Sequence, residues 1–135
     1  MNVALGGTLW QDLPSERPGS VLHAATGARD QRSHMISVTP GSRLAEALGR
    51  HALEVNSFHH QAIRELASEL VATAWADDQL VEGVESGPGA PWLLGVQWHP
   101  EEMHAERGAP DAGLFAAIVR ESVSASERDT ARSLR

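Results

Sequence analysis

The sequence predicts a mixed α/β domain that contains part of a doubly wound sheet. Short β-rich runs alternate with helical segments along the chain, a pattern typical of this class. Residues 92–98 form a near-continuous apolar run, as expected for a strand buried on both faces of a sheet. Only one or two helices can be assigned, too few to cover both faces, and 135 residues suffice for one domain.

The N-terminal part of the chain is expected to hold little regular structure. Residues 1–5 are apolar and precede Gly6 and Gly7, a pattern typical of the last turn of a helix that a left-handed glycine ends. A helix this short is not stable by itself, so we expect an upstream part that this chain lacks. Residues 11–33 are rich in Pro, Gly, Ser, Arg and His and predict a loop.

The middle of the chain predicts two strands around a short helix. Residues 35–38 form a β-rich run, and residues 52–57 predict the next strand. Between them, Ser42 can cap a helix over residues 43–48, and Gly49 is suited to end it.

A hairpin is expected next. Residues 66–76 and 80–84 carry alternating and β-branched side chains on either side of the polar pair Asp77-Asp78. Two such runs joined by a short polar turn are typical of paired antiparallel strands.

The C-terminal part predicts one helix and a tail. Residues 111–123 have apolar side chains at helical spacing and predict an amphipathic helix. Residues 124–135 are polar and are expected to form a tail without regular structure. The domain is therefore assigned to residues 1–123.

Composition excludes several classes of protein. The formal net charge is −7 and every cationic side chain is Arg, a balance that argues against a nucleic-acid partner. No stretch is long and apolar enough for a membrane-spanning helix, and the N-terminus lacks the pattern of a signal peptide. The chain has no cysteine and therefore no disulfide or thiolate metal site. We expect a cytoplasmic protein that needs no cofactor and binds no membrane.

The most informative motif lies at the end of the apolar run. His99 and Glu101 are two positions apart, so on an extended backbone their side chains project to the same side. Pro100 favours that extended conformation at His99. Glu101 can then accept a hydrogen bond from one ring nitrogen of His99 and leave the other nitrogen free to take a proton. The pair is a candidate general base with its orienting carboxylate.

The longer string Gly-Val-Gln-Trp-His-Pro-Glu at residues 95–101 resembles the closing motif of the class I glutamine amidotransferase superfamily. Val-Asn-Ser-Phe-His-His-Gln-Ala-Ile at residues 55–63 resembles its γ-glutamyl-γ-aminobutyrate hydrolase branch, relatives of the γ-glutamyl hydrolases. Further stretches that carry the resemblance are residues 2–13, the Ser33-His34 pair and residues 41–44. The resemblance implies the C-terminal portion of a flavodoxin-like three-layer sandwich.

The resemblance also implies a mechanism. In this superfamily a cysteine thiolate attacks the γ-glutamyl amide carbon. The residue matching His99 supports the thiolate and protonates the leaving amine, and the residue matching Glu101 orients that histidine. The cysteine belongs to a Gly-x-Cys-x-Gly elbow that this chain lacks. Ser57 is not expected to replace it, because no such elbow surrounds it. We therefore expect the chain alone to be inactive, and either to self-associate or to need an N-terminal partner.

The resemblance further assigns Ser57, His59 and Gln61 to the substrate pocket. His60 is expected to face solvent. His34 is not expected to contact the substrate.

No metal site is expected from the seven histidines. Adjacent residues such as His59 and His60 point to opposite faces of a strand, and the five-residue spacing of His99 and His104 suits neither a helix face nor a strand face. No His-Glu-x-x-His pattern occurs either.

Three functional hypotheses remain open from the sequence. The favoured one is part of a γ-glutamyl amide hydrolase, with the amine of the substrate unspecified. The alternative is a non-catalytic remnant or interaction module of the same fold. The glutaminase portion of a synthetase is less favoured, because residues 55–63 fit the free-standing hydrolases better.

Overall fold

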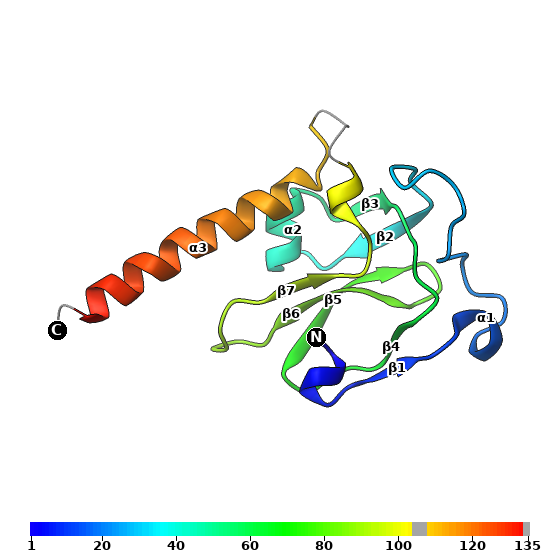
Figure 1. Ribbon diagram of the computed structural model, residues 1–135, viewed down its shortest axis with the longest axis horizontal. Coiled ribbons are helices and arrows are strands. Elements are labelled where there is room, and N and C mark those ends of the chain that lie inside the picture. The colour runs from blue at the N-terminus through cyan, green and yellow to red at the C-terminus, as the bar shows by residue number, and fades with distance from the viewer. Residues whose placement is uncertain (104–107, 134–135) are drawn as a thin grey trace.

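The computed structural model describes residues 1–103 and 108–133 and has a mixed α/β fold (Figure 1). Its centre is a five-stranded sheet in which every neighbouring pair of strands is antiparallel. In spatial order the strands are β3 (Ala52–Val55), β2 (His34–Val38), β5 (Leu70–Ala76), β6 (Val81–Ser86) and β7 (Leu94–Val96).

Two helices, α2 (Arg43–Leu48) and α3 (Ala112–Ser133), pack against each other beside the sheet (Figure 1). The hydroxyl of Ser42 accepts a hydrogen bond from the Ala45 amide at 3.0 Å, which satisfies one of the free amides at the start of α2. Gly49 ends the helix in the left-handed conformation, with φ of 64°. The predicted bounds and caps of this helix are thus confirmed.

The main apolar core lies between α2 and the sheet. Burial alternates along β2, so that every second side chain enters the core. Trp98 is also buried there, and its indole nitrogen donates a hydrogen bond to Asp111 Oδ1 at 3.0 Å. The buried members are Ile36, Val38, Leu44, Ala45, Leu48, Leu53, Val55, Ala74, Trp98 and Leu114.

A two-stranded antiparallel ribbon, β1 (Thr8–Trp10) with β4 (Ala62–Glu65), lies apart from α2 and α3 (Figure 1). The sequence does not predict it, because each strand is only three or four residues long. Its position is fixed by Asn2, whose side-chain amide donates to the carbonyls of Thr8 and Glu65, both at 3.0 Å. The same side chain accepts a hydrogen bond from the Ala67 amide at 2.9 Å.

The N-terminal turn and the predicted loop are also more structured than expected. Val3–Leu5 form a single 3-10 turn, which Gly6 ends in the left-handed conformation, as the Gly pair predicted. The predicted loop at residues 11–33 contains the short helix α1 (Leu13–Glu16).

Two expectations for the C-terminal part need correction. The strand predicted within residues 92–98 is only Leu94–Val96, and it is half-buried instead of buried on both faces; among the described strands it is the last one of the sheet. The helix predicted to end at Val123 continues to Ser133, so a tail without regular structure at residues 124–135 is wrong as far as Ser133. Residues 124–133 contain no Gly or Pro, so no local signal stops the helix.

None of the described helices combines the length and the apolar character that a membrane crossing requires, and this includes α3.

Replacement of Gly113 by Ala should destabilise the fold. A Cβ atom on Gly113 would lie 1.8 Å from the carbonyl oxygen of Ala47, so α3 could not keep its close approach to α2. This clash with backbone should outweigh the gain in helix propensity of about 1 kcal/mol. We expect a net loss of about 1–3 kcal/mol in urea unfolding. Ala116→Ser, on an exposed part of the same helix, should change stability by less than about 0.5 kcal/mol. Unchanged stability of Gly113→Ala would contradict this contact.

Candidate active site

The His99-Glu101 pair forms where the chain leaves β7 and enters the 3-10 turn Pro100–Met103. His99 Nδ1 lies 2.7 Å from Glu101 Oε1, the distance of a strong charge-assisted hydrogen bond. The two side chains remain accessible, with 34% and 56% of their surfaces exposed. The predicted contact between the two side chains is confirmed, but the extended backbone expected for it is wrong, because Glu101 lies in the 3-10 turn that starts at Pro100.

The ionisation of Glu101 decides which ring nitrogen of His99 carries the proton. Partial burial would raise the pKa of Glu101, but the hydrogen bond from His99 outweighs it, so the pKa lies below its ordinary value. An ionised carboxylate only accepts hydrogen bonds, so the proton between the two groups is held on Nδ1. Nε2 of the neutral ring then carries the lone pair and can accept a proton.

The backbone of His99 is held by Asn56, which is fully buried just after β3. The Asn56 side chain accepts a hydrogen bond from the His99 amide and donates one to the His99 carbonyl, both at 2.9 Å. It also donates to the carbonyl of Arg29 at 2.8 Å. One amide side chain therefore ties the loop after β7 to the end of β3 and to the loop that carries Arg29.

The imidazole of His99 is also bounded by an aromatic neighbour. The ring of Phe58 lies edge-on to it, with centroids 5.9 Å apart. Arg29 covers Phe58 with its guanidinium carbon 4.6 Å from the ring centroid, and Arg29 is paired with Glu102 at 2.6 Å. Backbone hydrogen bonds and these ring contacts together restrict the orientation of His99.

The residues assigned to the substrate pocket lie in different surroundings. Ser57 is fully buried, and its hydroxyl is 3.5 Å from Nδ1 of His23. His59 donates from Nδ1 to the carbonyl of Gln61 at 2.8 Å, and the side chain of Gln61 donates to Gln11. A substrate-binding role for these three residues stays a prediction. His60 is exposed over 64% of its side chain, as expected.

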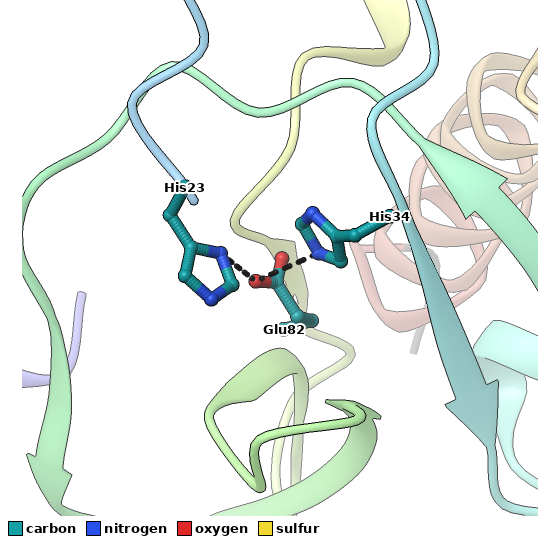
Figure 2. Close-up of side chains that lie close together, drawn as sticks. All are labelled: His23, His34 and Glu82. Atoms are coloured by element: carbon teal, nitrogen blue, oxygen red, sulfur yellow. Dashed lines mark ion pairs between the residues drawn. The ribbon is translucent and has the colours of Figure 1, made fainter. Parts of the chain in front are cut away.

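Sequence reasoning missed a buried cluster around Glu82 on β6 (Figure 2). Nitrogen atoms of His23, His34 and His59 lie 3.3, 3.4 and 3.5 Å from the same oxygen, Glu82 Oε1. These residues come from four separate segments, so no spacing in the sequence signals them. His104, considered above as a metal ligand, lies outside the described residues.

The Glu82 carboxyl is charged despite its burial. Burial by itself would raise the pKa of Glu82, but the surrounding histidines outweigh it and hold the pKa far below its ordinary value. For His23, burial lowers the pKa, whereas Glu82 and Asp78 raise it, with a net increase. The carboxylate of Glu82 is therefore buried with nitrogen atoms of three histidines around it.

Replacement of Asn56 by Ala should loosen the catalytic loop. It removes three buried hydrogen bonds, and we expect a loss of about 2 kcal/mol or more in urea unfolding, because partners remain unsatisfied. Nuclear magnetic resonance of the ring nitrogens should show a changed environment for His99.

Asn2→Ala is the matched control for this variant. Asn2 also makes three hydrogen bonds, but in the β1–β4 ribbon. It should lower stability without changing the signals of His99. Similar His99 signals in both variants would contradict the role given to Asn56.

Similarity to known proteins extends over most of the chain. It is 44% identical over 122 residues to the protein NtpR of Enterococcus hirae, covering 90% of this chain and 50% of that protein. It is 40% identical over 119 residues to a protein of Mycobacterium tuberculosis named provisionally as a glutamine amidotransferase, covering 88% of this chain and 36% of that protein. The chain thus spans half or less of the length of these relatives.

Solved structures confirm the fold. A Thermoplasma acidophilum protein, named provisionally as part of a GMP synthase, matches with a TM-score of 0.67 and 17% identity. The match covers 96% of this chain and 55% of that structure. The sequence profile of the family named Peptidase C26 matches residues 1–101, three quarters of the chain. The chain therefore belongs to the Peptidase C26 family.

Proposed function

We propose that this chain supplies the proton-transfer half of a hydrolase active site that cleaves γ-glutamyl amides. The observation that carries the proposal is the 2.7 Å hydrogen bond from His99 Nδ1 to Glu101, which leaves Nε2 as the proton acceptor. The nucleophile is a cysteine from a segment outside this chain, since the chain has none. Relatives named provisionally as glutamine amidotransferases support an amide substrate.

The chemistry proceeds in two steps. In the first, His99 Nε2 takes the proton of the cysteine thiol and the resulting thiolate bonds to the amide carbon; the C–N bond then breaks, and the leaving amine takes this proton from Nε2. In the second, His99 accepts a proton from water, and the resulting hydroxide attacks the thioester carbon and releases glutamate and the thiolate. Glu101 stabilises the imidazolium that forms in between and stays ionised throughout.

The cysteine-bearing segment has a surface on which to dock. One edge of β7 is unpaired among the described strands, and a cavity of about 300 Å³ lies between β6, β7 and the N-terminal turn. Apolar side chains beside the cavity are exposed, including Met1 at 55% and Val3 at 59%. An unpaired strand edge with apolar surface is a template for pairing with another segment.

A second apolar surface lies on α3. The exposed side chains of Phe115, Ile118, Val119 and Val123 recur at helical spacing and form one stripe. Much of α3 projects beyond the sheet (Figure 1). We assign this stripe to the same docking segment, because apolar stripes on helices are ordinarily covered.

The function is tested by the hydrolysis of a γ-glutamyl anilide. This chain alone should be inactive, whereas the chain extended by the upstream coding sequence should be active if that sequence supplies the cysteine. In the active form, His99→Asn should lower kcat by about 10³-fold or more, and Glu101→Gln by about 10²-fold or more. His60→Asn, an exposed neighbour of the pocket, is the control and should keep activity.

Other outcomes would redirect the proposal. Activity of the short chain would exclude a cysteine mechanism. Inactivity of both forms would favour a non-catalytic interaction module, the alternative function that the missing cysteine supports. Faster hydrolysis of glutamine than of γ-glutamyl-γ-aminobutyrate would favour the glutaminase portion of a synthetase.

The docking stripe predicts self-association of the chain in the absence of its partner. The double substitution Ile118→Glu with Val119→Glu should shift the chain towards monomer in light scattering, because charge disfavours burial of the stripe. Ser122→Glu, on a neighbouring exposed position of α3, adds a charge without removing an apolar side chain and should have a smaller effect. A monomeric wild-type chain at all concentrations would contradict the prediction.

A further inference from the structure

We propose that His23, His34 and Glu82 bind a divalent transition metal ion, for which Zn²⁺ is the best fit, with His59 beside them. Figure 2 shows the rings of His23 and His34 on opposite sides of Glu82, each with a nitrogen turned towards its carboxylate. The three ligand atoms lie within 4.8 Å of one another. Imidazole nitrogen and carboxylate oxygen are the ligands that Zn²⁺ takes in proteins that offer no thiolate.

The ring nitrogens that face Glu82 are placed to bind a cation. His59 Nδ1 faces a carbonyl oxygen at 2.8 Å and must donate, so Nε2 of the neutral ring carries a lone pair. His23 Nε2 lies 3.0 Å from the carboxylate of Asp78, to which it can donate, and Nδ1 then faces Glu82 and can bind a metal ion.

Neutral rings in these tautomers would turn lone pairs towards a carboxylate that only accepts. Within residues 1–103 and 108–133, neither oxygen of Glu82 makes a hydrogen bond, nor does Nε2 of His34 or of His59. His23 Nδ1 has one other polar neighbour, the hydroxyl of Ser57 at 3.5 Å. A metal ion among these atoms would accept all the lone pairs at once.

The distances fit such an ion. The three nitrogens lie 3.3–3.5 Å from Glu82 Oε1, longer than a good hydrogen bond. Two ligands bound tetrahedrally to Zn²⁺ at about 2.05 Å are separated by about 3.4 Å. The distances from the ring nitrogens to Glu82 Oε1 therefore match the separation of two ligands of one Zn²⁺ ion.

The surroundings of the ligands support the same assignment. Metal-bound histidines ordinarily donate their other ring nitrogen to a carboxylate, a carbonyl or a polar group. His23 does so to Asp78 and His59 to Gln61, and His34 Nδ1 lies 3.3 Å from the hydroxyl of Ser33.

Burial indicates a structural role for the ion. The side chains of His23, His34 and Glu82 are 1%, 5% and 0% exposed. A second cavity, of about 320 Å³, is lined by His23 and His59 and offers a path of entry. The ion would join four segments of the chain: β6, the start of β2, the loop before β2 and the segment before β4. This site is separate from the His99-Glu101 pair, so it does not depend on the proposed hydrolase function.

The test is Zn²⁺ binding by the full chain, freed of any polyhistidine tag and dialysed against a chelator. We expect one equivalent of Zn²⁺ in calorimetry, a rise in Tm with Zn²⁺ but not with Mg²⁺, and, with Co²⁺ as the probe, the intense visible absorption of tetrahedral coordination. No binding and no change in Tm would overturn the proposal and leave protons as the only cations in the cluster.

The Zn²⁺ affinities of single-residue variants show which side chains bind the ion. His23→Gln, His34→Gln and Glu82→Gln should each weaken Zn²⁺ binding by more than tenfold, while His51→Gln, an exposed histidine, should bind as the wild type does. Asp78→Asn only alters the partner of His23 and should weaken binding by about 10- to 100-fold. It addresses the case in which the buried variants do not fold. Wild-type affinity in Asp78→Asn and His34→Gln would place the Zn²⁺ elsewhere and overturn the assignment.

Discussion

The burial of the Glu82 carboxylate is the constraint around which this domain is arranged. A charge without exposure to water is costly unless opposite charges or ligands surround it. Three histidines from separate segments converge on it, and Asp78 in turn holds the ring of His23. The loop before β2, the sheet and the segment before β4 therefore meet at one point.

The candidate catalytic pair depends on a second set of polar contacts. Asn56 lies next to Ser57, so the same strand end reaches the Glu82 cluster with one residue and the backbone of His99 with the other. A displacement of the cluster would therefore also move the backbone of His99, because Ser57 and Asn56 are adjacent. The loop that carries His99 is held by this amide from one side and by the buried side chains of Trp98 and Met103 at its two ends.

One face of the sheet is covered by apolar packing, whereas other surfaces of the domain leave apolar side chains exposed. The face of the sheet towards α2 is closed by apolar side chains and by the Trp98–Asp111 hydrogen bond, which anchors the chain just before His99. The β7 edge, the N-terminal turn and the stripe on α3 leave apolar surface exposed. These are the surfaces on which we propose that the cysteine-bearing segment docks.

The sequence by itself determined the elements that depend on residues close together in the chain. The caps Ser42 and Gly49 determine α2, and the alternation of burial determines β2. The sequence also predicted the contact of His99 with Glu101, although a 3-10 turn and not an extended backbone brings the two side chains together. The β1–β4 ribbon, the half-burial of β7 and the Glu82 cluster were decided only by the tertiary structure. Each depends on contacts between residues far apart in the chain, such as Asn2 with Glu65 and His23 with Glu82, and hydrophobic periodicity carries no record of such pairs.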